Sequence, residues 1–395
     1  MENGIKKLHE ISKKESRLII GLMSGTSLDG LDIALCRIFG SGLNTKLELL
    51  AFDSFPYTSD FKKKLKQISF KIDNNLELIT LINKELAVLH ANMVNLFLKR
   101  NQLKNEEIDL IASHGQTIFH SPQRLRKQDS CGDATLQIGD ADQISVQTKI
   151  ITLSDFRQKN VAEGKEGAPL VVYGDYLLFK SNNENRILLN IGGISNFTII
   201  PKDGNFSAIL STDSGPGNTL MDQFIHQNDF SKFYDYNAEV ALQGNINYSL
   251  LEALLDHSFF KQDFPKSTGP ELFNLNYLNN ALEKSFTSNI SIPDIMATLN
   301  WFTAFTIAEA VNANTTSAQK YKLYFSGGGI HNPLLIQNLH QLLNNVEMYN
   351  FNQIGFNPDA KEAALFAVLA NETIAGDYSI FDQTTLSMGK ISLPN

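Results

Sequence analysis

The sequence has only two cysteines in 395 residues, too few for a disulfide framework, and they lack the spacing of metal ligands. This scarcity favours a reducing compartment, so we expect a cytoplasmic protein. No apolar run is long enough to cross a bilayer, and residues 1–17 lack the apolar region of a signal peptide. We therefore expect no membrane partner, and an N-terminal tail that is frayed.

Charge is also sparse. Asp, Glu, Lys and Arg together make up 19% of the residues, the net charge is -8, and hydrophobic residues make up 43%. An acidic chain of this kind does not offer the basic surface that nucleic acids require, so we expect no nucleic-acid partner. The apolar content predicts a globular protein with a sizeable core, and the length predicts two or three domains.

Several well-known catalytic motifs are missing. The sequence contains no GxxxxGK[ST], no HExxH, no CxxC and no GxSxG. These absences exclude a P-loop enzyme, zinc sites of those two kinds and a hydrolase with a nucleophile elbow.

The most informative stretch that is present is residues 18–37. Alternating apolar residues predict two strands, and the turn between them is rich in Gly, Ser and Thr. Glycine allows close approach, so such a turn can point N–H groups and hydroxyls at an anion. Asp29 and Asp32 stand beside the turn, where a magnesium ion could lie between carboxylate and anion. An ordinary hairpin with a polar turn is the alternative.

The same strand–turn–strand pattern returns at residues 186–200, with a polar turn at residues 192–196. The repetition suggests two similar halves. A third glycine turn, residues 327–329, follows a short strand and would allow a flat ring or a phosphate to approach closely.

Further polar clusters follow other predicted strands. Residues 113–117 read as a polar turn, in which His114 is either functional or structural. Asp213 lies among small residues that a substrate could reach; the alternative is a Pro–Gly turn in which Asp213 is the first, hydrogen-bonding residue. Residues 264–269 contain a cation and two hydroxyls, which suit an anion or a sugar, or else cap a helix.

Apolar residues at helical spacing predict helices over residues 76–100, 293–312 and 359–374. Glu362 stands at the start of the last helix, where a carboxylate either favours the helix dipole or contacts a substrate. The apolar face of this helix needs a partner, and we expect the helix to pack on the first domain.

Spaced blocks along nearly the whole chain together resemble the anhydro-N-acetylmuramic acid kinase family. They are GLMSGTSLDGLDIAL, ASHGQTIFH, LQIGDA, SDFR, GAPL, NIGGISN, DSGPGN, MD, FPKSTG.E.FN, SGGG..N and DAKEAALFAVLA. The resemblance implies an α/β, two-domain fold of the actin-like ATPase and sugar-kinase type, with a central cleft. The expected segments are residues 17–156, residues 157–355 and a C-terminal helix and tail at residues 356–395.

The resemblance also implies roles for the matched positions. Asp213 matches the catalytic base, and ATP and Mg²⁺ are the implied cofactors, with no metal ligand identified. His114, Arg157 and Glu362 match positions that line the sugar pocket. The residues expected to bind ATP are Gly25, Thr26, Ser27, Leu28, Asp29, Gly30, Leu31, Asp32, Gly192, Gly193, Ser195, Asn196, Gly327, Gly328 and Gly329.

In the implied reaction, water opens the anhydro bridge of the amino sugar at the anomeric carbon while ATP phosphorylates the 6-oxygen. The product is N-acetylmuramate 6-phosphate, an intermediate of peptidoglycan recycling. The sequence departs from the family pattern in two places: Asn160 replaces an acid and Lys165 replaces a glycine in the loop after Arg157, and Thr384, Thr385 and Leu386 replace Thr-Gly-Ala near the end. A kinase for a different sugar, or a catalytically weakened ATP-binding sensor of the same fold, therefore stay open as alternatives. The family tends to form dimers, so a homodimer is one candidate assembly.

Overall fold

The computed structural model describes residues 2–123, 131–164, 166–167, 170–343, 345–376 and 388–394. The chain forms two compact units: unit 1 comprises Met1–Leu178 and Asp359–Asn395, and unit 2 comprises Phe179–Pro358. The first unit therefore ends later than the expected boundary between residues 156 and 157. The reason is that the segment before Phe179 packs on the C-terminal helix of unit 1, where Lys361 pairs with the buried Asp175 at 2.9 Å.

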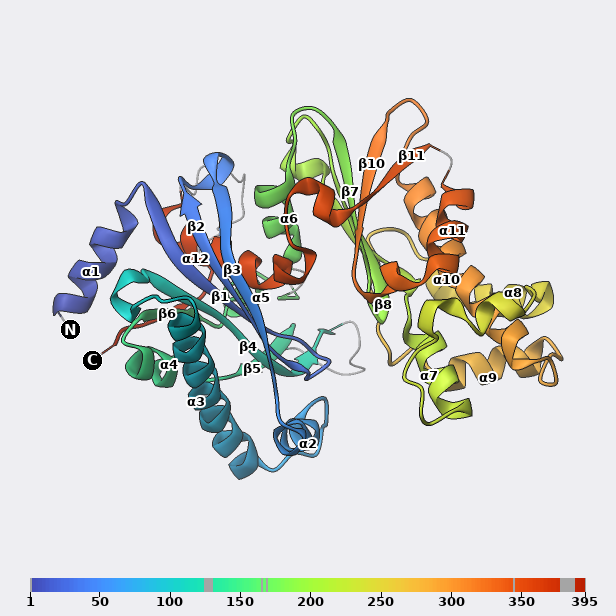
Figure 1. The fold of residues 1–395 in the computed structure, drawn as a ribbon, viewed down its shortest axis with the longest axis horizontal. Helices are drawn as coiled ribbons and strands as arrows, with labels where there is room; N and C mark the ends of the chain where they lie inside the picture. Colours follow the sequence, from blue (N-terminus) through green and yellow to red (C-terminus); the bar gives the residue numbers. More distant parts are fainter. Residues whose placement is uncertain are drawn as a thin grey trace. The chain divides into compact units, whose positions relative to one another are not determined.

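The sheet of unit 1 has the strand order β12–β6–β4–β1–β2–β3, and β5 pairs with β4 (Figure 1). The strands β1, β2 and β3 form an antiparallel meander, whereas β4 is parallel to β1 and β6 is parallel to β4. The strands are β1 (Ser16–Ser24), β2 (Gly30–Phe39), β3 (Lys46–Pro56), β4 (Leu110–Ser121), β5 (Ala134–Ile138), β6 (Ile151–Ser154) and β12 (Lys390–Ser392).

Both faces of this sheet are covered by helices. Side chains alternate between the faces of a strand, and Ile20 and Leu22 of β1 join a hydrophobic core with the helix α3. Gly21 faces the other way, and a Cβ there would lie 1.8 Å from the carbonyl oxygen of Ala363 in α12. The helices of unit 1 are α1 (Glu2–Ser12), α2 (Ser59–Ile68), α3 (Leu76–Arg100), α4 (Ala141–Thr148), α5 (Gln158–Ala162), α6 (Val171–Phe179) and α12 (Lys361–Ala375).

The N-terminal segment differs from the expectation of a frayed tail, because it forms the helix α1. Ile11 is only 2% exposed, and a Cβ at Gly4 would lie 3.3 Å from Leu393 near the other end of the chain. Arg17, just after α1, is buried and donates hydrogen bonds to Asn371 of α12 (2.6 Å) and to Gly40 O (2.7 Å). These long-range contacts order a segment whose own sequence is polar.

The sheet of unit 2 has the order β11–β10–β7–β8–β9. It repeats the connectivity of β6–β4–β1–β2–β3 in unit 1: an antiparallel meander, a fourth strand parallel to the first and a fifth parallel to the fourth. The predicted α/β class with two halves of like topology is therefore confirmed, and the central cleft stays a prediction. The strands are β7 (Asn185–Ile191), β8 (Ile194–Ile200), β9 (Leu210–Pro216), β10 (Tyr321–Ser326) and β11 (Val346–Asn350).

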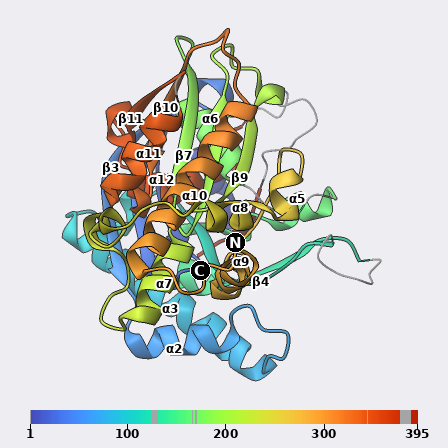
Figure 2. The same cartoon turned by 90° about the vertical axis from the view of Figure 1, so that its right-hand side faces the viewer.

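A long apolar helix, α10, packs on the sheet of unit 2 beside α11 (Figure 2). Ser291 caps α10 by accepting the N–H of Asp294 (3.2 Å), and a proline occupies its first turn. Ile307 and Val311 join the same core as Leu189 of β7. The helices of unit 2 are α7 (Thr219–Asn228), α8 (Tyr248–Leu255), α9 (Leu275–Lys284), α10 (Ile292–Ala313) and α11 (Pro333–Leu342). No helix among the described residues is long and apolar enough to cross a membrane.

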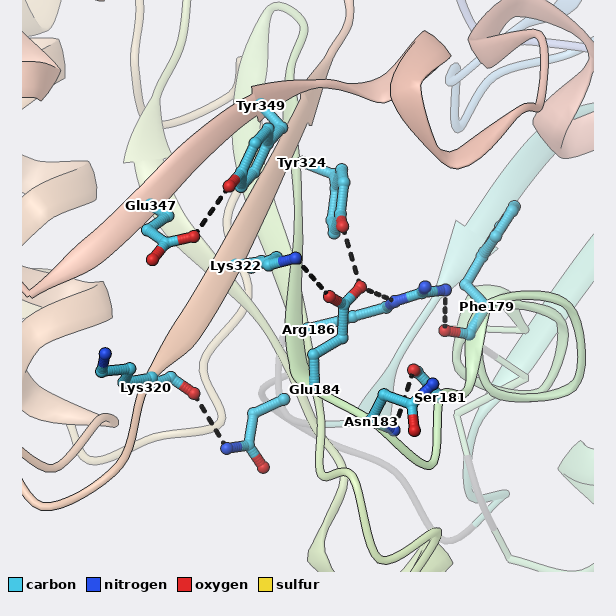
Figure 3. Close-up of polar contacts among 11 residues, drawn as sticks. Phe179, Ser181, Asn183, Glu184, Arg186, Lys320, Lys322, Tyr324, Glu347 and Tyr349 are labelled. Atoms are coloured by element: carbon cyan, nitrogen blue, oxygen red, sulfur yellow. Dashed lines mark hydrogen bonds and ion pairs between the residues drawn. The ribbon is translucent and has the colours of Figure 1, made fainter.

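The parallel strands β7, β10 and β11 begin at a charged cluster around Glu184 (Figure 3). Glu184 accepts hydrogen bonds from Arg186 Nε, Lys322 Nζ and the Tyr324 hydroxyl, each at 2.8 Å. Burial alone would raise the pKa of Glu184, but these three donors lower it to about 2. The cluster holds the amino ends of these strands together. Because α/β sheets bind ligands at the carboxyl ends of their strands, a ligand site is expected at the edge of the sheet opposite this cluster.

Candidate active site

The turn between β1 and β2 is compact and open on one side. Gly25 O accepts the N–H of Leu28 at 3.2 Å, and Leu28 has a φ of +59° and is buried. Thr26, Ser27 and Asp29 are exposed. A Cβ at Gly25 would meet no atom closer than Ser27 Oγ at 3.8 Å. The packing of the protein does not require glycine here, so the space beside Gly25 is available to a ligand such as a phosphate.

A buried chain of hydrogen bonds lies behind this turn. Gln116 Nε2 donates to Gly25 O at 3.1 Å, so its Oε1 is the acceptor for Ser24 Oγ at 2.6 Å. Ser24 Oγ then accepts from the Tyr57 hydroxyl (2.8 Å), which accepts from His90 Nε2 (2.7 Å). Burial lowers the pKa of His90 to about 3, so the ring is neutral, and its role as the donor in this chain places its one proton on Nε2. Sequence reasoning missed Tyr57 and His90, because isolated polar residues form no pattern.

Asp32 lies on β2, beside the turn. It accepts a hydrogen bond from the Ser54 hydroxyl. Burial raises the pKa of Asp32, and the nearby negative charges of Asp359 and Asp29 raise it further. No group of three or more His, Cys, Asp or Glu side chains placed to hold a metal ion occurs in the parts of the chain that the structure describes.

The expected polar turn at residues 113–117 is wrong. These residues belong to β4, which pairs with both β1 and β5, and the long-range pairing outweighs their polar character. Gly115 takes a φ of +74° within the strand, where the register with β1 also shifts. His114 is 4% exposed, and its ring lies against Phe366 of α12, with 4.8 Å between the ring centroids.

Arg157 and His114 form a directed pair. Arg157 Nε and Nη2 lie 3.2 and 3.0 Å from His114 Nε2, and Arg157 Nη1 donates to Gly167 O at 2.8 Å. A guanidinium can only donate, so Nε2 accepts and the ring proton is on Nδ1. Burial, together with the charge of Arg157, lowers the pKa of His114 to about 3. Within the described residues Nδ1 makes no hydrogen bond of standard geometry, although hydrogen bonding of the ring to the main chain of Gly115 and Ser24 acts to raise its pKa.

Glu362 shares this part of unit 1. Its side chain is exposed to solvent, yet enough protein surrounds the carboxyl group to raise its pKa. The charges of Asp32 and Asp175 raise the pKa further, while Lys361 and Arg157 act against this. Arg157 therefore contacts His114 directly and influences the Glu362 carboxyl group through its charge.

Asn160, which replaces the acid usual in the family pattern, is buried in α5. Its Oδ1 accepts the N–H of Gly167 at 2.9 Å, and Gly167 O in turn accepts from Arg157. An aspartate could accept the same hydrogen bond, so the asparagine preserves the link to Arg157. Lys165 and residues 384–386 lie outside the described residues.

In unit 2, the turn between β7 and β8 consists of Gly192 and Gly193. Gly193 O accepts the N–H groups of Gly217 (2.9 Å) and Thr219 (3.1 Å), and Gly192 O accepts that of Asn218 (2.8 Å). The turn therefore holds the start of α7. Residues 195 and 196, expected in the turn, lie in β8, and Ser195 is buried with its hydroxyl 2.5 Å from Ser214 Oγ.

The glycines after β10 pack against the same turn. Gly327 has a φ of +87°, and a Cβ there would lie 2.6 Å from Ile191 O. A Cβ at Gly329 would lie 2.3 Å from the Ile191 side chain, whereas Gly328 is exposed and would meet only Asn218 Nδ2 at 3.6 Å. The glycine turns of unit 2 therefore form one continuous surface at the carboxyl ends of β7 and β10.

Asp213 lies within β9, so the alternative that it begins a Pro–Gly turn is wrong. Its N–H donates to Lys266 O at 3.0 Å, and its Oδ2 accepts the N–H of Thr268 at 2.8 Å. The sequence left two interpretations open for the segment that contains Lys266: a cation and hydroxyls for an anion or a sugar, or the cap of a helix. Instead, the ammonium of Lys266 lies among phenylalanine rings and donates to Phe259 O at 3.2 Å.

Comparisons with known proteins show the family of the chain. A family model described as anhydro-N-acetylmuramic acid kinase matches residues 17–393. Curated relatives of that name are 49% identical in Pseudoalteromonas atlantica, where the match covers 100% of both chains, and 49% identical in Pseudoalteromonas translucida, where it covers 99% of both. Another, from Caldanaerobacter subterraneus subsp. tengcongensis, is 40% identical, with 98% of this chain and 100% of the relative covered. The chain therefore belongs to the anhydro-N-acetylmuramic acid kinase family.

Proposed function

We propose that this protein is an ATP-dependent kinase that hydrolyses the bridge of 1,6-anhydro-N-acetylmuramic acid and phosphorylates the 6-oxygen, giving N-acetylmuramate 6-phosphate for peptidoglycan recycling. Family membership supports the reaction class. The observation that carries the mechanism is the Asp213 carboxylate, which is held at Oδ2 by the N–H of Thr268 at 2.8 Å.

Asp213 is the general base in this mechanism. It takes a proton from water, whose oxygen forms a bond to the anomeric carbon. The bond from that carbon to the bridging oxygen breaks, and the electron pair goes to this oxygen. The oxygen then attacks the γ-phosphorus, the bond to the β–γ bridging oxygen breaks, and ADP leaves. Because water is a poor nucleophile, removal of its proton by a positioned base contributes about 10²- to 10⁴-fold.

The glycine turns bind the nucleotide. The open space beside Gly25 and the exposed Thr26 and Ser27 suit phosphate oxygens. In unit 2, the exposed Gly193 and Gly328 leave the main chain accessible to the nucleotide. Phosphoryl transfer is catalysed mainly by positioning and by charge neutralisation, which backbone N–H groups can supply without rearrangement.

Magnesium is the proposed metal ion. It typically binds to one or two carboxylates together with substrate phosphates, and Asp29 and Asp32 are the carboxylates beside the Gly25 turn. The raised pKa of Asp32 fits such a site, because neighbouring negative charge that destabilises the carboxylate would be offset by a cation. When bound, the ion would neutralise charge on the phosphates.

His114, Arg157 and Glu362 bind the sugar. The buried Nδ1–H of His114 can donate to a sugar oxygen, while Arg157 fixes the ring through Nε2. The raised pKa of Glu362 reflects a carboxyl group that is partly desolvated by the surrounding protein, and a sugar hydroxyl could form a hydrogen bond with it. The amino sugar is thereby the small-molecule partner of the protein.

A single assay tests the function. The protein is incubated with ATP and Mg²⁺, with and without the anhydro sugar, and both ADP and the sugar products are measured by mass spectrometry. We expect ADP to form only with the sugar, together with a product that has gained one water and one phosphoryl group. A phosphorylated product without the added water would show that the bridge is not hydrolysed. If ADP forms only with another sugar, the protein is a kinase for that sugar; if ATP binds in a calorimetric titration but ADP forms with no sugar tested, the protein is a sensor.

Location and assembly complete the proposal. The low cysteine content supports a cytoplasmic enzyme. We also infer a homodimer from the tendency of the family. Light scattering of the purified protein would give twice the mass of the chain if this is correct, and the mass of one chain if it is not.

A further inference from the structure

Lys266 has surroundings unlike those of a lysine that binds an anion. Its Nζ lies 4.5 Å from the ring centroid of Phe264, 4.6 Å from that of Phe259 and 5.8 Å from that of Phe260. It also donates a hydrogen bond to Phe259 O at 3.2 Å. A cation over an aromatic ring is attracted by the negative charge of the ring face. The rings of its own loop therefore hold the ammonium in place.

The main chain of Lys266 is bonded to β9 in both directions. Its N–H donates to Thr212 Oγ1 at 2.9 Å, and its carbonyl oxygen accepts the N–H of Asp213 at 3.0 Å and the hydroxyl of Thr212 at 3.1 Å. Two residues later, the N–H of Thr268 donates to Asp213 Oδ2 at 2.8 Å. Residues 266–268 therefore contact both the main chain and the carboxylate of Asp213.

We propose that Lys266 is a positioning residue: its ammonium, anchored among the phenylalanine rings, fixes residues 266–268 against β9 and so fixes the direction of the Asp213 carboxylate. This inference rests on the proposed function, in which Asp213 takes a proton from the attacking water. A general base must keep its oxygen within hydrogen-bond reach of that water, and small displacements of a catalytic group cost large factors in rate.

The positive charge is the part of Lys266 that matters. A methionine has similar length and flexibility, so it can occupy the same space among the rings. It cannot donate to Phe259 O, and it loses the attraction of a cation to the ring faces. An arginine keeps both the charge and the donors, so it should hold the loop better than methionine does.

The test compares K266M, K266R and the control K261M. Lys261 lies at the end of the neighbouring short helix, and its exposed ammonium pairs with the exposed Asp256 at 3.2 Å. For each protein, kcat, the KM values for sugar and ATP, the pH profile of kcat/KM and the melting temperature are measured. Amide hydrogen exchange of residues 264–268 is followed on the same samples.

We expect kcat of K266M to fall about tenfold or more at a temperature well below melting, with the KM for ATP unchanged. Loss of the Thr268 N–H from the carboxylate should move the acid limb of the pH profile to higher pH, since that hydrogen bond favours the ionised form. K266R should recover a large part of kcat, and K261M should match the wild type. A K266M variant with wild-type kcat, or a K266R variant as impaired as K266M, would overturn the proposal.

Hydrogen exchange separates this inference from the proposed function. If the wild type does not turn over the anhydro sugar, the proposed function fails, but the exchange comparison still decides whether Lys266 holds the loop. We expect amides at residues 264–268 to exchange at least about tenfold faster in K266M than in the wild type or K261M. Equal exchange in all three proteins would contradict the role of Lys266 whatever the substrate is.

Discussion

Asp213 is held by main-chain groups of a loop that follows it by more than fifty residues, at Thr268. Two roles are compared for this carboxylate: a general base in the reaction, and an acceptor that only holds the loop in place. The D213N variant keeps the shape of the side chain but cannot take a proton from water, so we expect turnover to fall by about 10²- to 10⁴-fold. ATP binding should be unchanged. Turnover and melting temperature are measured on the same preparation, and a folded variant with near wild-type turnover would remove Asp213 from the mechanism.

Gly25 and Gly21 lie on the same hairpin but have opposite environments. A Cβ at Gly25 meets only open space, so G25V should fold normally and weaken ATP binding, by about tenfold or more if one phosphate hydrogen bond is lost. A Cβ at Gly21 would lie 1.8 Å from Ala363 O, so G21A should lower the melting temperature strongly. Calorimetric titration with ATP and thermal melts measure both effects. Wild-type ATP affinity in folded G25V would contradict the phosphate role.

Substitutions of Asn160 test whether the departure from the family pattern at this position alters binding of the sugar. N160D keeps an acceptor for the N–H of Gly167, so we expect a change of less than about threefold in the KM for the sugar. N160L leaves that N–H buried without a partner, at a cost of about 1–3 kcal/mol, and should raise this KM through the displaced Arg157. The KM for ATP is the internal control. A larger defect in N160D than in N160L would mean that Asn160 acts by another route.

At the scale of elements, the sequence correctly predicted those strands and turns that a local pattern of apolar residues and glycines determines. The hairpins that carry Gly25 and Gly192 were predicted correctly, because alternating apolar residues and glycines form a local signal. Residues 113–117 were placed wrongly, because pairing of β4 with the distant strands β1 and β5 outweighs their polar character. The helix α1 was missed for the same reason, since its ordering depends on contacts with the other end of the chain.

The residues of the candidate site likewise fall into those that a local sequence pattern reveals and those that only long-range contacts bring together. The glycine turns and Asp213 could be found from clusters of small and polar residues. The hydrogen-bond chain through Tyr57 and His90 could not, because neither residue belongs to a motif and they lie in separate segments, the loop after β3 and the helix α3. The boundary between the units was also missed, since it depends on the pairing of Asp175 with Lys361, 186 residues later.

At the scale of the whole molecule, the two units should respond to acid in opposite directions. His90 and His114 in unit 1 have pKa values lowered to about 3, whereas burial raises the pKa of Asp222 in unit 2 to about 7. Between pH 7 and 5 the unfolded histidines bind more protons than the folded ones, so unit 1 loses about 2 kcal/mol for each histidine. Folded Asp222 binds more protons than unfolded Asp222 in this range, so unit 2 gains stability.

Amide hydrogen exchange at pH 7 and pH 5, corrected for the intrinsic exchange rates, measures the change in stability of each unit. We expect the protection of α3 in unit 1 to fall and that of α7 in unit 2 to rise as the pH is lowered. H90N should reduce the effect in unit 1, and D222N should abolish the gain in unit 2. Parallel losses of protection in both units would show that other groups dominate their pH dependence.

Unit 1 is completed by α12, which covers the face of β1 at Gly21 and accepts hydrogen bonds from Gly42 and Thr45 through Glu372. During synthesis on a ribosome, strands β1 to β6 of unit 1 emerge first, whereas this helix and the short strand β12 emerge last. All of Phe179–Pro358 is made in between, which takes about 10–40 s at about 5–20 residues per second. The nascent first unit waits with an uncovered apolar face while unit 2, continuous in sequence, can finish folding. A premature stop before Lys361 would therefore damage the Gly25 hairpin, although the codons for that hairpin had already been read correctly.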